Sequence, residues 1–562
     1  MTPQEAVAHL ARTDARFQLG EADVFGAPYR VFTNAASHVR ELLANAAPAY
    51  AGREALVYGD ERWTHDRLCR DVRRVANALA SELDVQPGEP VAMVLRNYPE
   101  LPILTLAVAA LGAVAVPMNA WWSSDELRYA LEDCRARVVF ADAARQQRIQ
   151  PFADELGLVM VAVRDAVGDR CYGDLLRVGD DRAWPAVDIA TDDDFAVIYS
   201  SGSSGRAKGV VLTHRGVISS VYSRLMTTAL LPFLMDSPPP TPAAPAALVT
   251  TPLFHVTALQ AVLLPGLCNG AKLVLMHKWE PDEAVRLIVR ERITHFTGVP
   301  TQSVDLMEAT RRIGVHLDSL VAVGSGGDKM PAAQVPRLAA AFPNAAIATG
   351  WGMTETNSLG TVLLGPDYLA HPESAGRPLP PLQDFRIVDE SGSPVAVGEV
   401  GELTVRSAAN MRGYLNQPEA TAAAVRGGWL HTGDLARVDA EGLYYIVGRR
   451  DSLIIRGGEN ISCLEVEGAL YRHPAVAEAG VFGIPDERLG ESVGAAIQLK
   501  PDVRLDAAVL ADFLAGHLAR FKVPTRIWFR DQPLPRGGTD KIDRRALRAE
   551  CLAEVQPVSG KG

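Results

Sequence analysis

The sequence is poor in cysteine and has no cysteine pattern that could bind a metal. Six cysteines occur in 562 residues, at Cys69, Cys134, Cys171, Cys268, Cys463 and Cys551. Their wide, irregular spacing excludes the common zinc motifs and is typical of reduced thiols in a cytosolic protein. The first twenty residues also lack the apolar core of a secretory signal. We therefore expect a cytoplasmic protein.

Long apolar runs and excess basic charge are missing as well. The most apolar stretch, Ile103 to Val116, is shorter than a membrane span and stops at Pro117, so a buried helix is predicted there and no transmembrane segment is expected. The formal net charge is −11. This balance argues against a nucleic-acid partner bound through broad basic surfaces, while local basic pockets for a polyanionic ligand stay possible.

The length and composition indicate a globular protein of several structural units. Hydrophobic residues make up 48% and charged residues 22% of the chain, and 562 residues exceed one ordinary core. In the first half, "THDRLCRDVRRVANALASEL" has helical periodicity with a possible cap at Thr64, whereas "PVAMVL" and "ARVVFAD" are typical of buried strands. Layered α/β subdomains are predicted, with a proline-rich surface excursion at 232–246.

The texture changes near residue 380. "DFRIVDESGSPVAVGEVGELTVRS" is typical of short strands joined by glycine turns, which predicts a β-rich subdomain. After residue 462 two helical segments, the second at 506–521, alternate with two strand-like ones, as in a compact α+β domain. The predicted fold is therefore α/β, with a large domain at 1–450 and a small mobile α+β domain at 451–562.

A loop suited to phosphate lies at Tyr199–Val210, "YSSGSSGRAKGV", directly after a strand-like segment. Its glycines permit close approach of backbone N–H groups to an anion, and its serines and Lys208 add donors. It is not a Walker A loop, because Lys208 is followed by glycine rather than Ser or Thr. A merely flexible Gly/Ser loop is the alternative, against which the preceding strand and the single lysine count.

Further motifs occur with this loop along nearly the whole chain. They are "PLFHV" at 252–256, "GSGGD" at 324–328, "GWGMTET" at 350–356, "GELTVRS" at 401–407, "GYLNQPEAT" at 413–421, "WLHTGD" at 429–434, "GRRDSLIIRGGENI" at 448–461 and "LPRGGTDKI" at 534–542. In content and order they resemble the adenylate-forming superfamily of acyl- and aryl-CoA synthetases, peptide-synthetase adenylation domains and beetle luciferases. The resemblance implies ATP, Mg²⁺ and CoA as cofactors.

The resemblance also implies catalytic roles for four residues. Lys541 is similar to the family's adenylation lysine, whose ammonium stabilises charge where a carboxylate attacks the α-phosphate of ATP. Glu355 resembles the magnesium ligand, and Thr354 would offer a hydroxyl to the α-phosphate. His255 resembles the gate between the acyl and thiol channels. Taken alone, Lys541 could be a surface lysine, Thr354 and Glu355 a helix cap, and His255 a core residue.

Nucleotide contacts are implied for a larger set. Asp434 resembles the aspartate that accepts hydrogen bonds from both ribose hydroxyls, a role that suits a carboxylate because it offers only acceptors. Arg449 resembles the arginine that reaches ribose or phosphate. Asp451 falls at the family hinge, about which the small domain turns to present the thiol channel for the second half-reaction. The other implied residues are the phosphate loop Ser200, Ser201, Gly202, Ser203, Ser204, Gly205 and Lys208, the adenine walls Gly326, Gly327, Asp328, Gly350, Trp351, Gly352 and Met353, and the thiol-channel glycines Gly457 and Gly458.

Several positions depart from the family pattern. Ala207 replaces the loop proline, which predicts a less rigid loop and weaker ATP binding, and Ser203 and Ser204 replace threonines. Asp540 replaces the glycine before Lys541 and could attract that lysine or repel a carboxylate substrate. The remaining departures are Ser452 for an acidic residue and Cys463 for a proline.

The leading hypothesis is an AMP-forming acid–CoA ligase for a hydrophobic acid, with a medium- or long-chain fatty acid preferred. The apolar stretch Val256 to Leu264 suits such an acid, and no acidic residue for a substrate amine follows "PLFH". Alternatives are an aryl or other bulky acid, a carrier protein as acceptor, an inactive homologue disabled by Asp540, and a luciferase-like oxygenase. Because the chain ends soon after Lys541 we expect no fused carrier domain, and a homodimer is possible.

Overall fold

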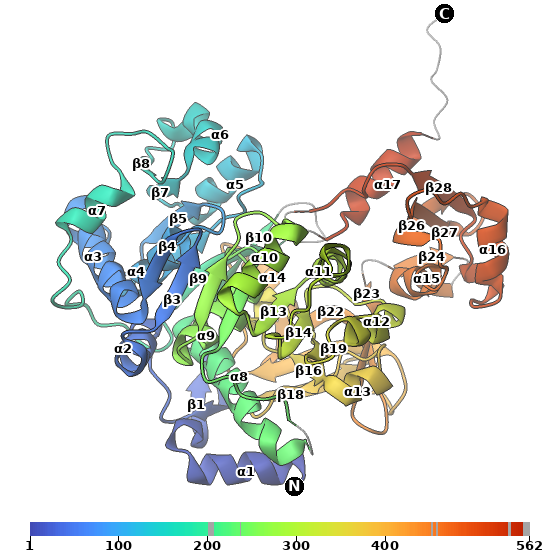
Figure 1. The fold of residues 1–562 in the computed structure, drawn as a ribbon, viewed down its shortest axis with the longest axis horizontal. Coiled ribbons are helices and arrows are strands. Elements are labelled where there is room, and N and C mark those ends of the chain that lie inside the picture. The colour runs from blue at the N-terminus through green and yellow to red at the C-terminus, as the bar shows by residue number, and fades with distance from the viewer. Residues whose placement is uncertain (201–206, 236–237, 451–452, 457–458, 538–540, 555–562) are drawn as a thin grey trace, which may run out of the picture.

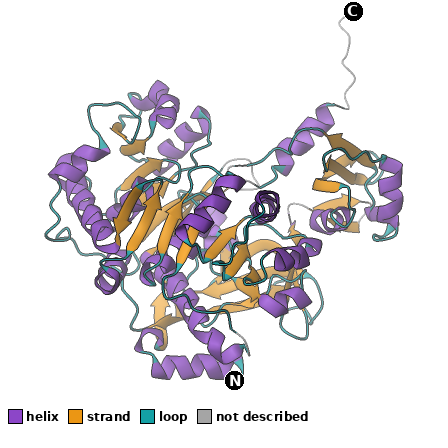
Figure 2. Cartoon of the chain, viewed as in Figure 1, coloured by secondary structure: helices purple, strands orange, loops and turns teal. Residues whose placement is uncertain are grey.

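A computed structural model describes residues 1–200, 207–235, 238–450, 453–456, 459–537 and 541–554. Figures 1 and 2 show two mixed layers of strands and helices side by side in the large domain, with a smaller domain set at one edge. The α/β class and the small C-terminal α+β domain are confirmed. The predicted boundary at residue 451 lies outside the described residues, between the ends of β23 and β24.

The first large sheet has seven strands, two of which flank the predicted phosphate loop. Its inner strands are parallel, and the hairpin β9–β10 and the edge strand β20 add antiparallel pairs. In order, the strands are β20 (Gly413–Tyr414), β10 (Lys208–Thr213), β9 (Asp194–Ser200), β6 (Val114–Pro117), β5 (Pro90–Val94), β7 (Val138–Ala141) and β8 (Val159–Ala162). The loop at 201–206 therefore joins two hydrogen-bonded strands.

The second large sheet has nine strands, and six neighbouring strands within it are parallel. Because ligands of such sheets bind beyond the carboxyl ends of parallel strands, the loops after β11, β14 and β15 are the ones suited to hold a substrate. In order, the strands are β17 (Arg377–Pro378), β16 (Thr361–Leu364), β15 (Ala346–Thr349), β14 (Ala322–Ser325), β13 (His295–Gly298), β11 (Ala246–Val249), β12 (Lys272–Leu275), β3 (Glu54–Tyr58) and β4 (Glu61–Thr64).

Helices cover these sheets, and their sequences explain where they start and which face they bury. In α3 (His65–Leu83) the Thr64 side chain accepts a hydrogen bond from the Arg67 N–H, as predicted, and the apolar face from Leu68 to Leu83 is buried. The other helices of the large domain are α1 (Pro3–Thr13), α2 (Val39–Tyr50), α4 (Glu100–Ala110), α5 (Ser124–Cys134), α6 (Ala143–Ala153), α7 (Tyr172–Val178), α8 (His214–Leu234), α9 (Leu264–Cys268), α10 (Pro281–Glu291), α11 (Pro300–Ile313), α12 (Val335–Ala341), α13 (Gly365–Ala370) and α14 (Pro418–Ala424).

Three predicted elements have different bounds. The apolar run from Ile103 to Val116 is not one helix: α4 ends at Ala110, Gly112 turns the chain with φ of 74°, and β6 follows. The predicted surface excursion at 232–246 begins inside α8, which continues to Leu234. The predicted helix at 506–521 is shorter, because α16 (Ala507–Ala515) ends before Gly516.

The part of the chain that the structure describes contains one candidate membrane span. Helix α8 is long and apolar enough to cross a membrane by length and composition, and 44% of its apolar window is buried inside the domain.

The β-rich subdomain follows, as predicted. It pairs β18 (Gln383–Val388), β19 (Gly401–Ser407), β22 (Trp429–Val438) and β21 (Val425–Arg426), and β23 (Tyr444–Arg449) also pairs with β22. A separate hairpin, β1 (Leu19–Val24) with β2 (Ala27–Phe32), lies near the N-terminus.

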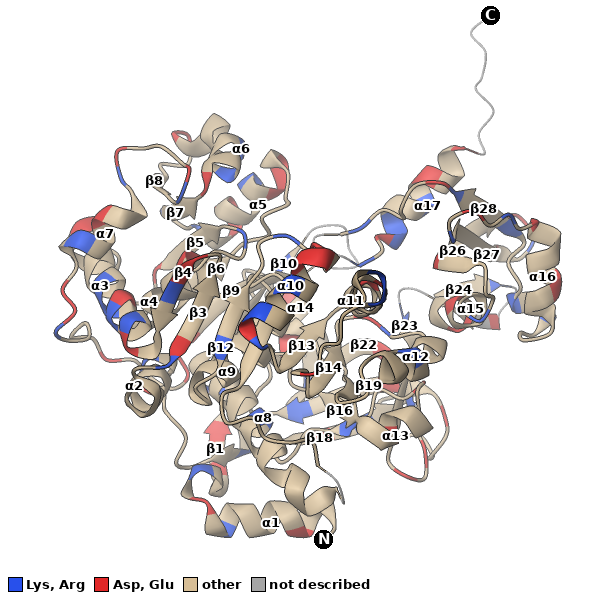
Figure 3. Cartoon of the chain, viewed as in Figure 1, with Lys and Arg blue, Asp and Glu red and all other residues tan. Residues whose placement is uncertain are grey.

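The C-terminal domain has its own sheet and apolar core. Its strands are β25 (Glu459–Ser462), β24 (Leu453–Arg456), β27 (Gly490–Leu499), β26 (Val476–Asp486) and β28 (Arg526–Arg530), and its helices are α15 (Cys463–Leu470), α16 and α17 (Arg544–Ala553). The domain touches the large one where Ser462 Oγ donates to the Val447 carbonyl and where Arg472 pairs with Glu373 at 3.4 Å. Acidic and basic residues are interspersed on both domains (Figure 3).

A buried histidine at the start of α8 predicts acid sensitivity. His214 is fully buried, and its Nδ1 accepts from the Val39 N–H at 3.2 Å, so burial, with His38 and Arg40 nearby, lowers its pKa to about 3. Because the unfolded chain binds this proton below about pH 6.5, the histidine's contribution to stability is present above that pH and is lost as the pH falls toward 3.

We expect His214→Asn, whose amide oxygen can replace the acceptor, to lessen this loss. Between pH 6 and pH 4 the free energy of unfolding of the wild type should fall more steeply than that of the variant, by up to about 1.4 kcal/mol per pH unit. Urea unfolding of both proteins at pH 7, 6, 5 and 4 measures the difference. Equal slopes would contradict this account of His214.

Candidate active site

Two of the residues predicted to contact the nucleotide, Trp351 and Arg449, meet at the buried carboxylate of a third, Asp434. Strands β22 and β23 place Asp434 opposite Arg449, whose Nε donates to Asp434 Oδ1 at 3.0 Å. The Trp351 indole N–H donates to the other oxygen, Oδ2, at 2.7 Å. Asp434 is 4% exposed. A buried carboxylate held by two donors keeps further acceptor capacity on each oxygen, as recognition of a ribose diol requires.

The two glycine motifs lie at the carboxyl ends of parallel strands. "GSGGD" follows β14 and "GWGM" follows β15. Gly326 faces open space, so it fits the predicted adenine wall. Gly350 and Gly352 have another reason: a Cβ there would stand 2.4 Å from the Thr361 carbonyl oxygen and 2.6 Å from that of Ser358. These two glycines allow close chain packing, which the sequence did not indicate.

Lys541 reaches this site from the small domain. Its side chain packs on Gly327, so that a Cβ added to Gly327 would stand 3.3 Å from Lys541 Cε. Burial lowers the pKa of the Lys541 ammonium, and the carboxylates of Asp328 and Asp434 oppose that shift. The structure thus joins residues 327 and 541, which are far apart in the sequence, and places Asp328, which was predicted for the adenine wall, close to the lysine.

Backbone pairing on either side of the 538–540 gap and a partly buried ion pair hold Lys541 in place. The Gly537 N–H donates to the Lys541 carbonyl at 2.8 Å, and the backbones of Arg536 and Ile542 form an antiparallel β-bridge. Just beyond, Arg544 pairs with Glu467 of α15 at 2.7 Å. On the N-terminal side of this segment, Leu534 is 2% exposed and packs in an apolar cluster. These contacts therefore fix the segment that carries Lys541 toward the predicted nucleotide site.

The predicted magnesium ligand fits a cation. Glu355 is 7% exposed, and burial raises the pKa of its carboxyl. Its Oε1 accepts from the Tyr414 hydroxyl at 3.0 Å, whereas its Oε2 accepts from no described residue. No group of three or more His, Cys, Asp or Glu suited to a metal exists among the described residues. One open carboxylate oxygen suits Mg²⁺, which takes most of its ligands from water and phosphate. The hydroxyl of the neighbouring Thr354 makes no hydrogen bond within the described part of the chain.

The phosphate loop is described only at its ends. Ser200 and Lys208 stand opposite each other in the β9–β10 pair. Seven predicted loop and channel residues, together with two further departures and the hinge, lie outside the described residues: Ser201, Gly202, Ser203, Ser204, Gly205, Gly457, Gly458, Ser452, Asp540 and Asp451. Their roles stay predictions.

His255, the predicted gate, lies just before a π-helix. It lies after β11, its ring 4.6 Å from that of Phe254, and the π-helix η2 (Thr257–Leu263) begins two residues later. Such π-turns are frequent at functional sites. Gln260 is the one polar residue among the buried residues of η2. It is fully buried, and neither polar atom of its amide is hydrogen-bonded within the described chain. Sequence reasoning missed Gln260 because a lone glutamine in an apolar run carries no motif.

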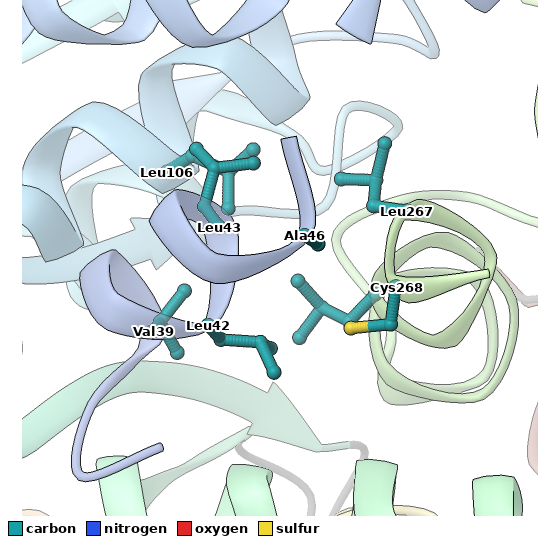
Figure 4. Close-up of a pocket in the computed structure, with 8 residues that line it drawn as sticks. Val39, Leu42, Leu43, Ala46, Leu106, Leu267 and Cys268 are labelled. Atoms are coloured by element: carbon teal, nitrogen blue, oxygen red, sulfur yellow. The ribbon is translucent and has the colours of Figure 1, made fainter. Parts of the chain in front are cut away.

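A small apolar cavity exists elsewhere and is not part of this site. It lies between α2, α4 and α9, lined by Leu42, Leu106, Cys268 and neighbouring apolar residues (Figure 4). Burial raises the pKa of the Cys268 thiol to about 12, which makes it a poor nucleophile. The cavity offers no polar group to a carboxylate or a nucleotide.

Comparison with known proteins establishes the family. Residues 43–415 match the model of the AMP-binding enzyme, and residues 465–541 match that of the AMP-binding enzyme C-terminal domain. The chain belongs to this family. It is an AMP-forming acid–CoA ligase, an enzyme class that uses ATP, Mg²⁺ and CoA.

Relatives and solved structures agree in fold and differ in substrate. Feruloyl-CoA synthase of an Amycolatopsis species is 35% identical over 88% of this chain and 95% of that protein. A long-chain-fatty-acid–CoA ligase of Mycobacterium tuberculosis, FadD13, is 31% identical over 88% and 94%. The anthranilate-CoA ligase AuaEII in complex with anthranoyl-AMP has a TM-score of 0.84 at 27% identity, covering 92% of this chain and 98% of that one.

Proposed function

We propose that this ligase activates a hydrophobic carboxylic acid at the site formed by Asp434, Arg449, Glu355 and Lys541. The observation that carries the proposal is the position of Lys541, packed on Gly327 beside Asp328 and near Asp434 and Arg449. A buried ammonium near the carboxylate proposed to bind ribose can stabilise the negative charge that builds up when a substrate carboxylate attacks the α-phosphate.

In the first half-reaction, a carboxylate oxygen attacks the α-phosphorus of ATP. The bond between that phosphorus and the bridging oxygen breaks, and pyrophosphate leaves with the electron pair. Lys541 neutralises the charge on the α-phosphate oxygens, while Asp434 fixes the ribose and the Thr354 hydroxyl donates to a phosphate oxygen. Bound at Glu355, Mg²⁺ supplies charge neutralisation to the phosphates.

In the second half-reaction, the CoA sulfur attacks the acyl carbon of the acyl-AMP, and AMP leaves with the electron pair of the broken C–O bond. We propose that the domain from residue 451 onward turns for this step, withdrawing Lys541 and presenting its 457–458 face. The contacts that must break include the Ser462–Val447 hydrogen bond and the Arg472–Glu373 pair.

For the acid, a medium- or long-chain fatty acid is the first candidate. Ala258, Leu259 and Leu263 of η2 are buried directly after His255 and would give an alkyl chain an apolar wall. The fatty-acid ligase FadD13 is among the relatives. Each buried methylene contributes about 0.8 kcal/mol, so chain length should be strongly selected.

The buried amide of Gln260 favours a second candidate, an aryl acid that carries an oxygen substituent. The Ser223 hydroxyl, on α8 against which η2 packs, is also fully buried without a partner within the described chain. An unpaired buried polar group costs about 1–3 kcal/mol, which a substrate hydroxyl or methoxyl would relieve. The name of the 35% identical relative, feruloyl-CoA synthase, agrees with such a substrate.

A substrate panel tests the proposal. Acid-dependent pyrophosphate release is measured with and without CoA for octanoate, dodecanoate, cinnamate and 4-hydroxy-3-methoxycinnamate. We expect release with hydrophobic acids and thioester only with CoA. Pyrophosphate release without thioester formation would contradict the CoA ligase activity. If no acid in the panel caused release, the proposed activation of a hydrophobic acid would be wrong.

Substitution of Gln260 separates the two candidates. For an oxygenated aryl acid, we expect Gln260→Leu to lower kcat/KM about tenfold relative to the unsubstituted acid, because the hydroxyl loses its partner. For an alkyl acid the ratio of chain-length preferences should stay unchanged. Gln302→Leu is the matched control, since Gln302 is equally buried but accepts a hydrogen bond from Thr250 at 3.0 Å, so its loss should lower stability instead.

Location and assembly complete the proposal. We place the enzyme in the cytoplasm on its six scattered thiols, none of which forms a disulfide. A homodimer stays a prediction, which the mass of the protein in solution tests.

A further inference from the structure

The motif "GYLNQPEAT" has a position in the fold that explains its residues. It contains β20, the edge strand that pairs with β10 directly after the phosphate loop, with Tyr414 opposite Val210. On either side, the Arg412 N–H donates to the Val211 carbonyl at 2.9 Å and the Leu415 N–H to the Gly209 carbonyl at 2.7 Å. The chain returns from the β-rich subdomain to fasten itself to this strand.

The hydroxyl of Tyr414 holds the carboxylate of Glu355. It donates to Oε1 at 3.0 Å, and burial together with Glu355 raises the pKa of the Tyr414 hydroxyl, which keeps it a donor. The backbone of the same segment also holds this residue, because the Met411 N–H donates to the Glu355 carbonyl at 2.8 Å. Glu355 is thus fixed at both ends, with Oε2 left open.

The ring of Tyr414 holds Lys208. The lysine Nζ lies 5.0 Å from the ring centroid, within cation–π range. No carboxylate in the described part of the chain pairs with Lys208, and among these residues the Tyr414 ring is the group found beside its ammonium. A single side chain therefore touches both the lysine of the phosphate loop and the carboxylate proposed for the metal.

The rest of the motif fixes Tyr414 itself. Its N–H donates to Thr421 Oγ1 at 2.9 Å, and that hydroxyl donates to the Gln417 carbonyl at 2.9 Å. Gly413 permits this, since a Cβ there would stand 2.6 Å from Thr421 Cγ2. The glycine, tyrosine and threonine of the motif act together to set one ring.

We propose that Tyr414 is a positioning residue that couples the two sides of the triphosphate site. Its hydroxyl orients Glu355 so that Oε2 faces the metal, and its ring holds Lys208 toward the phosphates. The inference rests on the proposed roles of Glu355 and Lys208. An alternative is that Tyr414 only packs the β20 edge, in which case hydroxyl and ring would matter only for stability.

Calorimetric titration with ATP, without acid and with either Mg²⁺ or EDTA, distinguishes the two. Tyr414→Phe keeps the ring, so we expect unchanged affinity in EDTA and an about tenfold smaller gain on adding Mg²⁺. Tyr414→Leu should lower the affinity in EDTA as well. Tyr445→Phe removes a hydrogen bond of the same 3.0 Å length, to Asp439, and should change neither value.

Several results overturn the proposal. One is a Tyr414→Phe variant with the full Mg²⁺-dependent gain, and another is an equal loss for Phe and Leu in EDTA. Where the variants are unstable, the double variant with Glu355→Gln decides: adding Tyr414→Phe should cause no further loss of the Mg²⁺ gain, and an additive loss contradicts the coupling. Failure of the proposed function differs from these, since the wild type would then show no Mg²⁺-dependent gain at all.

Discussion

Replacing Lys541 by alanine is expected to remove acid-dependent pyrophosphate release while sparing thioester formation from preformed acyl-AMP. Loss of a single charge-stabilising donor typically costs about 10²- to 10³-fold in rate, and Lys541 is the buried cation on Gly327. The second half-reaction contains no new bond to phosphorus, so it should proceed at near the wild-type rate. Single-turnover measurement of each half-reaction gives the two values.

Gly327 offers an independent way to displace the lysine. Gly327→Ala would crowd Lys541 Cε and strain a backbone with φ of 81°. Gly314→Ala is the matched control, because Gly314 has φ of 76° but open space around it. Adenylation should fall in the first variant and persist in the second. Equal loss of both half-reactions in Lys541→Ala would contradict the separation of steps between domain positions.

Replacing Asp434 by alanine is expected to raise the KM for ATP about 10²-fold. The carboxylate would bond both ribose hydroxyls, and hydrogen bonds to a charged group contribute about 1.5–3 kcal/mol each. The change also leaves the Trp351 and Arg449 donors without their acceptor. Initial rates of acid-dependent pyrophosphate release against ATP concentration measure the effect.

Glu441→Gln serves as control for Asp434, since it removes a carboxylate from the turn between β22 and β23 away from the site. Its KM should equal that of the wild type. Trp351→Phe should give a smaller rise than Asp434→Ala, because it removes one donor and keeps an aromatic ring. An unchanged KM in Asp434→Ala would show that the ribose binds elsewhere.

The fold could be predicted where local pattern and packing agree. Helix α3 has both an apolar face and a capping threonine, so its start at His65 followed from the sequence. The run from Ile103 to Val116 misled because a buried helix and a buried strand are equally apolar, and the turn at Gly112 is one residue. Strand pairing decides such cases, and it is a long-range property.

The candidate site could be predicted residue by residue, but not as an arrangement. Motifs named Lys541, Asp434 and Glu355 separately, whereas the position of Lys541 beside the other two depends on how the small domain docks. Tyr414 stood inside a recognised motif without a role, because its meaning comes from pairing β20 with β10. Gln260 had no motif, and only its burial without a partner reveals it.

A crystal structure with a non-hydrolysable acyl-AMP analogue tests the central claim most directly. The account predicts both ribose hydroxyls within hydrogen-bond distance of Asp434, the Lys541 ammonium on the group that replaces the α-phosphate, and the acyl chain beside η2. A ribose bound away from Asp434, or an analogue that Lys541 does not touch in any position of the small domain, would contradict it.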